Sequence, residues 1–306
     1  MIIGLATRTF RRSIMGDDIM LRKMRTFSLG VVLLACAIPM TTVAQESAPD
    51  GVEITPDVVY GHKDGMALTF DVFRPADANG AAILYMVSGG WVSRWSPPES
   101  ATPRFSALLE KGFTVLAVRH GSSPRYKVPE AEADVRRALR YVHLNADRLG
   151  IDADRIGVYG GSAGGHLSLM LGLVSDAGEE SADPVLRAPS RVAAVVAYYP
   201  PVDLRSMVGP NERSPALEFP AEQAASISPV LHATSDDPPT LLIHGDADEL
   251  VNISHSVRMQ EALDGAGVMS DFITIPGGDH GFRNPEHRAS AEALMVDWFA
   301  KHLGGS

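Results

Sequence analysis

The sequence predicts an α/β protein with a mainly parallel central sheet of about eight strands and helices on both faces. Three observations lead to this class. β-like and helical segments alternate along most of the chain, a Gly-rich strand–turn–helix pattern lies near its middle, and no linker or low-complexity stretch interrupts the main body. Because ligands bind beyond the carboxyl ends of the strands in such sheets, functional residues are expected on the loops at that edge.

Eight segments have the composition of strands. The first two, residues 52–60 and 66–73, flank a Lys63-Asp64-Gly65 turn and predict an antiparallel hairpin. Pro56 would confine the first of them to a sheet edge. The other six are mostly apolar runs, typical of buried strands: residues 82–87, 113–118, 156–159, 192–199, 240–244 and 271–275.

Apolar residues at near-helical spacing predict helices between these strands. The expected helical segments are residues 105–111, 130–149, 167–173, 253–266 and 290–302. Residues 203–228 are the exception, because Pro210, Pro215 and Pro220 interrupt any regular pattern. We expect this excursion to be either a substrate-facing lid or a surface loop.

Residues 1–44 form an N-terminal extension with the pattern of a signal peptide. A basic run at residues 21–25 precedes a mostly apolar segment, and small residues end at Ala44, where cleavage is expected. Met20 or Met24 is then a candidate start. A second interpretation is lipoprotein processing at Cys36. Either predicts a secreted or periplasmic protein, with no stable membrane insertion unless Cys36 is lipidated, since a membrane-spanning helix needs about 20 apolar residues.

Residues 45–306 are expected to form a single catalytic domain. The chain of 306 residues has a formal net charge of −10, which argues against nucleic acid or an anionic membrane as a partner. Its only cysteine, Cys36, lies in the expected signal, so a processed protein would contain no disulfide. Stability must then come from the core.

Ser162 is the candidate nucleophile. It lies in Gly160-Gly161-Ser162-Ala163-Gly164, a G-x-S-x-G pattern between a predicted strand and a predicted helix. A Ser on so sharp a turn has strained backbone angles, and Gly160 and Gly164 supply the lack of bulk that lets the turn close. The start of the following helix favours negative charge on a group bonded to Ser162. The alternative is a chance match in a Gly-rich loop.

The other catalytic roles fall on loops after later strands. His280 follows the last strand in a Gly-rich loop and is the candidate base, while Asp246, Asp248 and Glu249 are alternatives for the acid that orients it. The oxyanion that forms on the substrate needs hydrogen-bond donors to stabilise it. The backbone N–H of Ala163 is one candidate, and the loop of residues 87–91 is expected to supply the others.

These motifs resemble those of α/β-hydrolases of the esterase/lipase and feruloyl-esterase-like (BD-FAE-like) group, and they are similar to the catalytic domain of prolyl oligopeptidases. The resemblance covers about residues 52–303 and implies the α/β-hydrolase fold. The family pattern His-Gly-Asp-x-Asp-x-x-Val implies that Asp248 is the triad acid, and the oxyanion loop is implied to use Gly89 and Gly90. Trp91, Trp95 and His166 are candidates for the substrate pocket, with packing as the alternative for His166.

The chain departs from the family pattern in two places. The family's H-G-G-G-W is Val87-Ser88-Gly89-Gly90-Trp91 in this chain, so the His and the first Gly are replaced. His120 stands where relatives usually carry Tyr. The internal support of the loop and the substrate preference are therefore left open.

The sequence as a whole predicts a secreted serine esterase with the triad Ser162, Asp248 and His280, acting through an acyl-enzyme without a cofactor or metal. Its expected substrates are small-molecule or carbohydrate esters, with acetyl and feruloyl esters among them. Two alternatives stay open. One is a peptidase of the prolyl oligopeptidase type, although no propeller-like repeat accompanies the domain. The other is a non-catalytic binding protein on a hydrolase scaffold.

Overall fold

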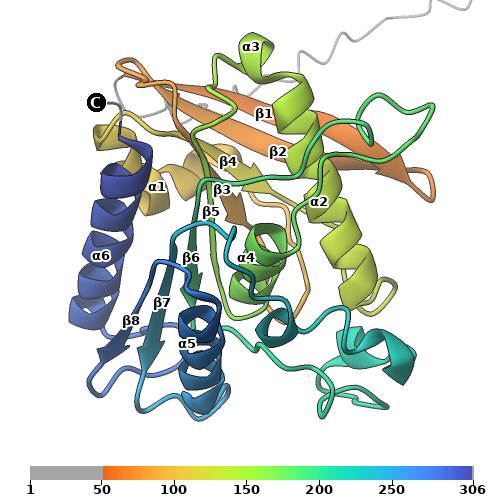
Figure 1. Ribbon diagram of the computed structural model, residues 1–306. Coiled ribbons are helices and arrows are strands. Elements are labelled where there is room, and N and C mark those ends of the chain that lie inside the picture. Colours follow the sequence, from red (N-terminus) through yellow and green to blue (C-terminus); the bar gives the residue numbers. More distant parts are fainter. Residues whose placement is uncertain (1–50, 305–306) are drawn as a thin grey trace, which may run out of the picture. The chain divides into compact units, whose positions relative to one another are not determined.

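The computed structural model describes residues 51–304. The expected signal peptide, its alternative start sites and Cys36 lie outside these residues. The described strands form one sheet of eight strands in the order β1-β2-β4-β3-β5-β6-β7-β8 (Figure 1). The strands are β1 (Val52–Lys63), β2 (Met66–Pro75), β3 (Ala82–Met86), β4 (Thr114–Val118), β5 (Ile156–Gly161), β6 (Ala194–Tyr198), β7 (Thr240–Gly245) and β8 (Ser270–Ile275).

The prediction of a mainly parallel sheet is confirmed. Strands β3 to β8 pair in parallel, whereas β1 and β2 form an antiparallel hairpin and β2 runs antiparallel to β4. Asp64 and Gly65 close the hairpin with φ angles of 48° and 80°, as expected for a tight turn between twisted strands. Strand β1, which contains Pro56, lies at the sheet edge.

Helices cover both faces of the sheet. They are α1 (Thr102–Glu110), α2 (Val128–Leu144), α3 (Ala146–Leu149), α4 (Ala163–Leu173), α5 (Ser254–Ala266) and α6 (Pro285–Leu303). Alternate strand residues enter two cores: Leu84 and Val158 pack with α2, α4 and α5, while Ile83 and Tyr159 pack with α1 and α6. Within residues 51–304, no helix has the length and hydrophobicity needed to cross a bilayer.

Two departures from the predicted helix bounds have a clear local cause. The segment predicted as one helix over residues 130–149 breaks at Asn145, whose side chain donates to the carbonyl of Tyr141 and ends α2 before α3 begins. Helix α6 starts at Pro285 rather than near residue 290. Asn284 caps it by accepting a hydrogen bond from the N–H of Glu286, and this Asn-Pro-Glu start signal is what the apolar spacing alone missed.

Residues 203–228 pack onto the domain. Leu204 and Leu217 are buried in the core with α2, α4 and α5. The Ser228 hydroxyl donates to the carbonyl of Ala224 and accepts from the N–H of Leu204, which ties the two ends of the segment together. The core thus holds this excursion by its apolar side chains.

Two close backbone contacts shape the carboxyl edge of the sheet. A Cβ on Gly160 would lie 2.5 Å from the carbonyl carbon of Gly164, so the turn between β5 and α4 closes only without side chains there. A Cβ on Gly245 would lie 2.0 Å from the carbonyl oxygen of Gly278. Because Gly245 ends β7 and Gly278 follows β8, this contact brings the two following loops together.

Replacing Gly245 by Ala is therefore expected to lower the free energy of unfolding by about 2 kcal/mol or more, since the added Cβ overlaps backbone that cannot move aside cheaply. Gly265, inside α5, is a matched control, because a Cβ there meets nothing within 4 Å. Gly265→Ala should stabilise the chain by up to about 1 kcal/mol. Urea unfolding of both variants tests this, and equal stabilities would contradict it.

Candidate active site

Ser162 lies on a strained turn between β5 and α4. Its φ and ψ angles are 55° and −120°, a combination that residues with side chains adopt only under constraint. The Ser162 N–H donates to the carbonyl of Tyr198 at 2.9 Å, and the Ser162 carbonyl accepts from the N–H of His166 at 2.9 Å. These bonds hold the backbone while the hydroxyl remains at the sheet edge.

Asp248 is the acid that contacts His280. His280 Nδ1 donates to Asp248 Oδ2 at 2.7 Å, and Asp248 Oδ1 accepts from the N–H groups of Leu250 and Val251. Of the other acids that the sequence left open, Asp246 accepts from the N–H of Gly277, and Glu249 is exposed. With its proton on Nδ1, neutral His280 has a free lone pair on Nε2.

Ser162 and His280 line the same cavity, which has a volume of about 670 Å³. No hydrogen bond joins their side chains among the residues that the structure describes. Catalytic hydrogen bonds are often long in unliganded enzymes and tighten when substrate binds. The three predicted triad residues thus gather at one edge of the sheet, with the acid–base bond already formed.

Aromatic side chains form much of the cavity wall. Tyr85 from β3, Tyr159 from β5 and Tyr198 from β6 line it together with Tyr199 and Phe282. Neighbouring rings in this wall are close: the centroids of Tyr85 and Tyr159 are 4.9 Å apart, and those of Tyr199 and Phe282 are 5.1 Å apart. Such a wall can contact apolar or planar parts of a ligand.

His244 is a buried neighbour of the acid. Its Nε2 lies 2.8 Å from the carbonyl of Val251 and 3.3 Å from Asp248 Oδ2, and its Nδ1 lies 2.8 Å from the Ser256 hydroxyl. Both partners of Nε2 are acceptors, so Nε2 carries the proton and the Ser256 hydroxyl donates to Nδ1. Burial lowers the pKa of His244, which keeps this tautomer neutral. His244 therefore helps to fix the carboxylate that orients His280.

The oxyanion loop differs in one respect from the prediction. The N–H of Gly89 donates to the carbonyl of Val92 at 3.1 Å, so it is not free to donate to a ligand in this structure. Within residues 51–304, the N–H of Gly90 has no such partner. The N–H of Ala163 lies in the first turn of α4, where helical geometry leaves it unpaired. Gly90 and Ala163 are thus the remaining candidate donors.

The support of this loop, which the sequence left open, comes from His120. The ring of His120 is buried, its Nδ1 donates to the carbonyl of Gly121 at 2.8 Å, and its Nε2 accepts from the Ser88 hydroxyl at 2.8 Å. Burial lowers the pKa of His120, so Nε2 remains an acceptor. The loop that carries Gly89 and Gly90 is anchored at Ser88 by this bond.

The structure corrects the expected substrate contacts of three residues. Trp91 and His166 are buried in the core, 4% and 0% exposed, and neither lines the catalytic cavity. The Trp91 indole N–H donates to His166 Nδ1, and His166 Nε2 donates to the carbonyl of Ile227. His166 thus has the packing role that was its alternative. Trp95 is exposed and does not line the cavity either.

Tyr199 is a site residue that the sequence analysis missed. Its ring lies against the His280 imidazole, with centroids 4.6 Å apart, and it follows β6 with a φ of 37°. Burial raises the pKa of Tyr199 to about 12, so its hydroxyl stays protonated beside the nucleophile. The available signal was its place at the carboxyl end of the predicted strand 192–199, the edge where functional residues are expected.

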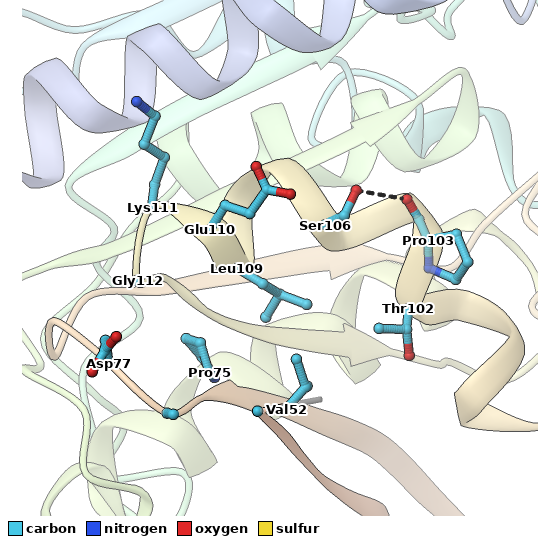
Figure 2. A pocket seen from close by; sticks show the side chains of 12 residues that line it. Val52, Pro75, Asp77, Thr102, Pro103, Ser106, Leu109, Glu110, Lys111 and Gly112 are labelled. Carbon is cyan, nitrogen blue, oxygen red and sulfur yellow. Dashed lines mark hydrogen bonds between the residues drawn. The ribbon is translucent and has the colours of Figure 1, made fainter. Parts of the chain in front are cut away.

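A second cavity, of about 540 Å³, lies beside α1 (Figure 2). Val52, Pro75, Thr102 and Leu109 are among its lining residues, and no predicted triad residue is. Within residues 51–304, no group of three or more His, Cys, Asp or Glu side chains is arranged to hold a metal ion. The acid–base pair therefore places the candidate site in the cavity that contains Ser162.

Comparison with known families agrees with this geometry. The model of the BD-FAE family matches residues 70–263, from strand β2 into helix α5. The chain belongs to the BD-FAE family. The match includes Ser162 and Asp248, whereas His280 lies beyond it, in the part where the structure supplies the position of the base.

Relatives of this BD-FAE chain include esterases. Esterase LipQ of Mycobacterium tuberculosis is 30% identical over 74% of the chain, which spans only 57% of LipQ. A truncated carbohydrate esterase from gut microbiota is 29% identical, with a TM-score of 0.69 over 83% of this chain and 98% of that one. Thermogutta terrifontis esterase 2 phosphorylated by paraoxon is 26% identical, with a TM-score of 0.67 over 83% and 95% of the two chains.

Asp248→Asn is expected to lower kcat by about a thousandfold or more, because an amide can present its N–H₂ to His280 and favour the tautomer that cannot act as base. Glu249→Gln is the matched control, since Glu249 is the neighbouring exposed carboxylate and should leave kcat near that of the wild type. Steady-state kinetics on a short-chain ester measures both. Similar losses in the two variants would contradict the assignment of Asp248.

Stability should depend on pH through His166. Burial lowers its pKa from the ordinary value of 6.5 to about 4. Between these values the unfolded chain binds a proton that the folded chain does not, so the free energy of unfolding decreases as the pH is lowered. At pH 4 this residue alone should lower it by roughly 3 kcal/mol relative to pH 7. Urea unfolding at pH 7 and pH 4.5 should show a smaller decrease for His166→Gln than for the wild type. An equal decrease would show that His166 is not the source.

Proposed function

We propose that the chain is a serine hydrolase of carboxylic esters that works through an acyl-enzyme intermediate. The observation that carries this proposal is the 2.7 Å bond between His280 and Asp248, in a cavity that also contains Ser162 on its strained turn. The esterases among its relatives support it. Thermogutta terrifontis esterase 2, which paraoxon phosphorylates, supports an activated nucleophile on this fold.

In the proposed first step, Ser162 Oγ attacks the ester carbonyl carbon and gives its proton to His280 Nε2. The imidazolium that forms is stabilised by Asp248, which accepts from Nδ1. The carbonyl oxygen becomes an oxyanion, and the N–H groups of Ala163 and Gly90 are the proposed donors to it. Each such donor is worth about 3–4 kcal/mol in the transition state.

The tetrahedral intermediate then collapses. The bond to the leaving alcohol breaks, and the alcohol oxygen takes the proton from His280 Nε2, which leaves the acyl group on Ser162 and His280 neutral. A water molecule repeats the sequence: it gives a proton to Nε2, its oxygen attacks the acyl carbon, and Ser162 Oγ leaves with that proton. The products are the carboxylic acid and the free enzyme.

Carbohydrate esters are the proposed natural substrates, with acetyl and feruloyl groups as candidate acyl parts. The structural similarity to a carbohydrate esterase supports this class. The wall of Tyr85, Tyr159 and Tyr198 also supports it, because tyrosine rings contact the flat faces of sugars and phenolic acids. The signal-like pattern of residues 1–44 supports secretion or export to the periplasm.

Ser162→Ala is expected to abolish the hydrolysis of short 4-nitrophenyl esters while the thermal unfolding midpoint stays near that of the wild type. The wild type should be labelled covalently by a fluorophosphonate, and the variant should not. An unlabelled, inactive wild type would favour a non-catalytic scaffold. Faster cleavage of Xaa-Pro amides than of esters would favour a peptidase, and activity retained without the Ser162 hydroxyl would exclude the mechanism.

A further inference from the structure

Two arginines line the catalytic cavity and are not committed elsewhere. Arg104 lies in α1 and Arg288 in α6, so they come from two different elements beside the site. Arg119 and Arg140, by contrast, pair with Asp71 and Asp176. Within residues 51–304, the guanidinium groups of these two arginines make no hydrogen bond and no ion pair. In the described part of the chain, the one aromatic ring that faces either guanidinium is that of Tyr85, whose centroid lies 5.5 Å from the Arg104 guanidinium carbon.

Both arginines come from helices that pack on the same face of the sheet. Burial raises the pKa of Glu292, and the attraction of Arg104 and Arg288 opposes that rise. The same two cations oppose the effect of burial on the pKa of Tyr199, which lies against His280. Arg104 and Arg288 line the same cavity as Ser162 and His280, which places both side chains at the wall around the reacting atoms.

The charge of this cavity is opposite to that of the chain. Glu292 is the one carboxylate among the lining residues, against Arg104 and Arg288, while the whole chain has a formal net charge of −10. With two guanidinium groups against one carboxylate, the lining carries a net positive charge, which favours anionic ligands. A guanidinium with no protein partner offers donors in the geometry that matches a carboxylate.

We propose that Arg104 and Arg288 form a subsite for a carboxylate on the substrate, so that the preferred esters are anionic. The inference rests on the proposed ester hydrolysis and narrows its substrate class. The carboxylate belongs to the part of the ester that lies between α1 and α6, while the aromatic wall contacts the neighbouring part. The carboxylate can belong to either the acyl part or the alcohol part of the ester.

Two matched pairs of substrates test both halves. With the charge on the alcohol side, 4-acetoxybenzoic acid is compared with 4-acetoxybenzamide. With the charge on the acyl side, monomethyl terephthalate is compared with methyl 4-carbamoylbenzoate. In at least one pair, kcat/KM for the acid should exceed that for the amide by about tenfold, the effect of one charge-assisted contact. Raising NaCl from about 0.05 M to about 0.5 M should reduce this preference, because salt screens exposed charges.

Variants then test whether the two arginines cause the preference for acids over amides. In Arg104→Gln and Arg288→Gln, kcat/KM for the acid should fall about tenfold more than for its amide partner, and the Lys variants should retain part of the preference. Arg191→Gln is the matched control. Arg191 is exposed and precedes β6, so it lies near the amino ends of the parallel strands, opposite the catalytic cavity. It should change neither rate.

Failure of the inference is distinguishable from failure of the proposed function. Equal kcat/KM for acids and amides in both pairs, or a preference that survives in both Gln variants, would overturn the subsite. The absence of hydrolysis with every neutral and charged ester would instead overturn the ester-hydrolase proposal.

Discussion

The contact between Gly245 and Gly278 is the constraint on which the site depends. Backbone meets backbone there, with no room for a Cβ, at the point where the chain leaves β7 and β8. A hydrogen bond of 2.6 Å, donated by the N–H of Gly277 to the side chain of Asp246, also joins the two loops. With the loops held together, Asp248 and His280 are within hydrogen-bonding distance before any ligand binds. The pair is thus a consequence of strand packing, since parallel neighbours end at one edge.

Buried histidines keep this edge in one hydrogen-bonding arrangement. His120, His166 and His244 each bond through both ring nitrogens, and burial lowers the pKa of all three. Each is therefore neutral, with one donor and one acceptor in fixed places. His280 differs: it lines the cavity and Asp248 bonds its Nδ1, but within residues 51–304 its Nε2 has no hydrogen-bond partner. Its role requires that difference, since a base must have a free nitrogen.

The sequence predicted well those features that are local or that follow from chain order. Apolar runs located six of the eight strands, the turn at Lys63-Asp64-Gly65 located the first hairpin, and the G-x-S-x-G turn located Ser162, because all three signals depend on neighbouring residues. The cavity wall was not predictable in this way. Arg104 and Arg288 come from helices far apart in the chain, and only packing against one sheet face brings them beside Ser162. Trp91 was misjudged for the same reason, since its burial depends on His166 in another element.

The oxyanion loop shows how two departures from a family pattern can offset each other. Each one looks unfavourable when taken singly: Ser88 replaces a glycine of the loop, and His120 replaces a tyrosine on the strand-end segment beside it. In the structure they form one bond, in which the Ser88 hydroxyl donates to His120 Nε2. That bond requires His120 to be neutral, and burial provides this. Replacing Ser88 alone would leave the buried His120 Nε2 without its partner, so the loop's anchor depends on the pair.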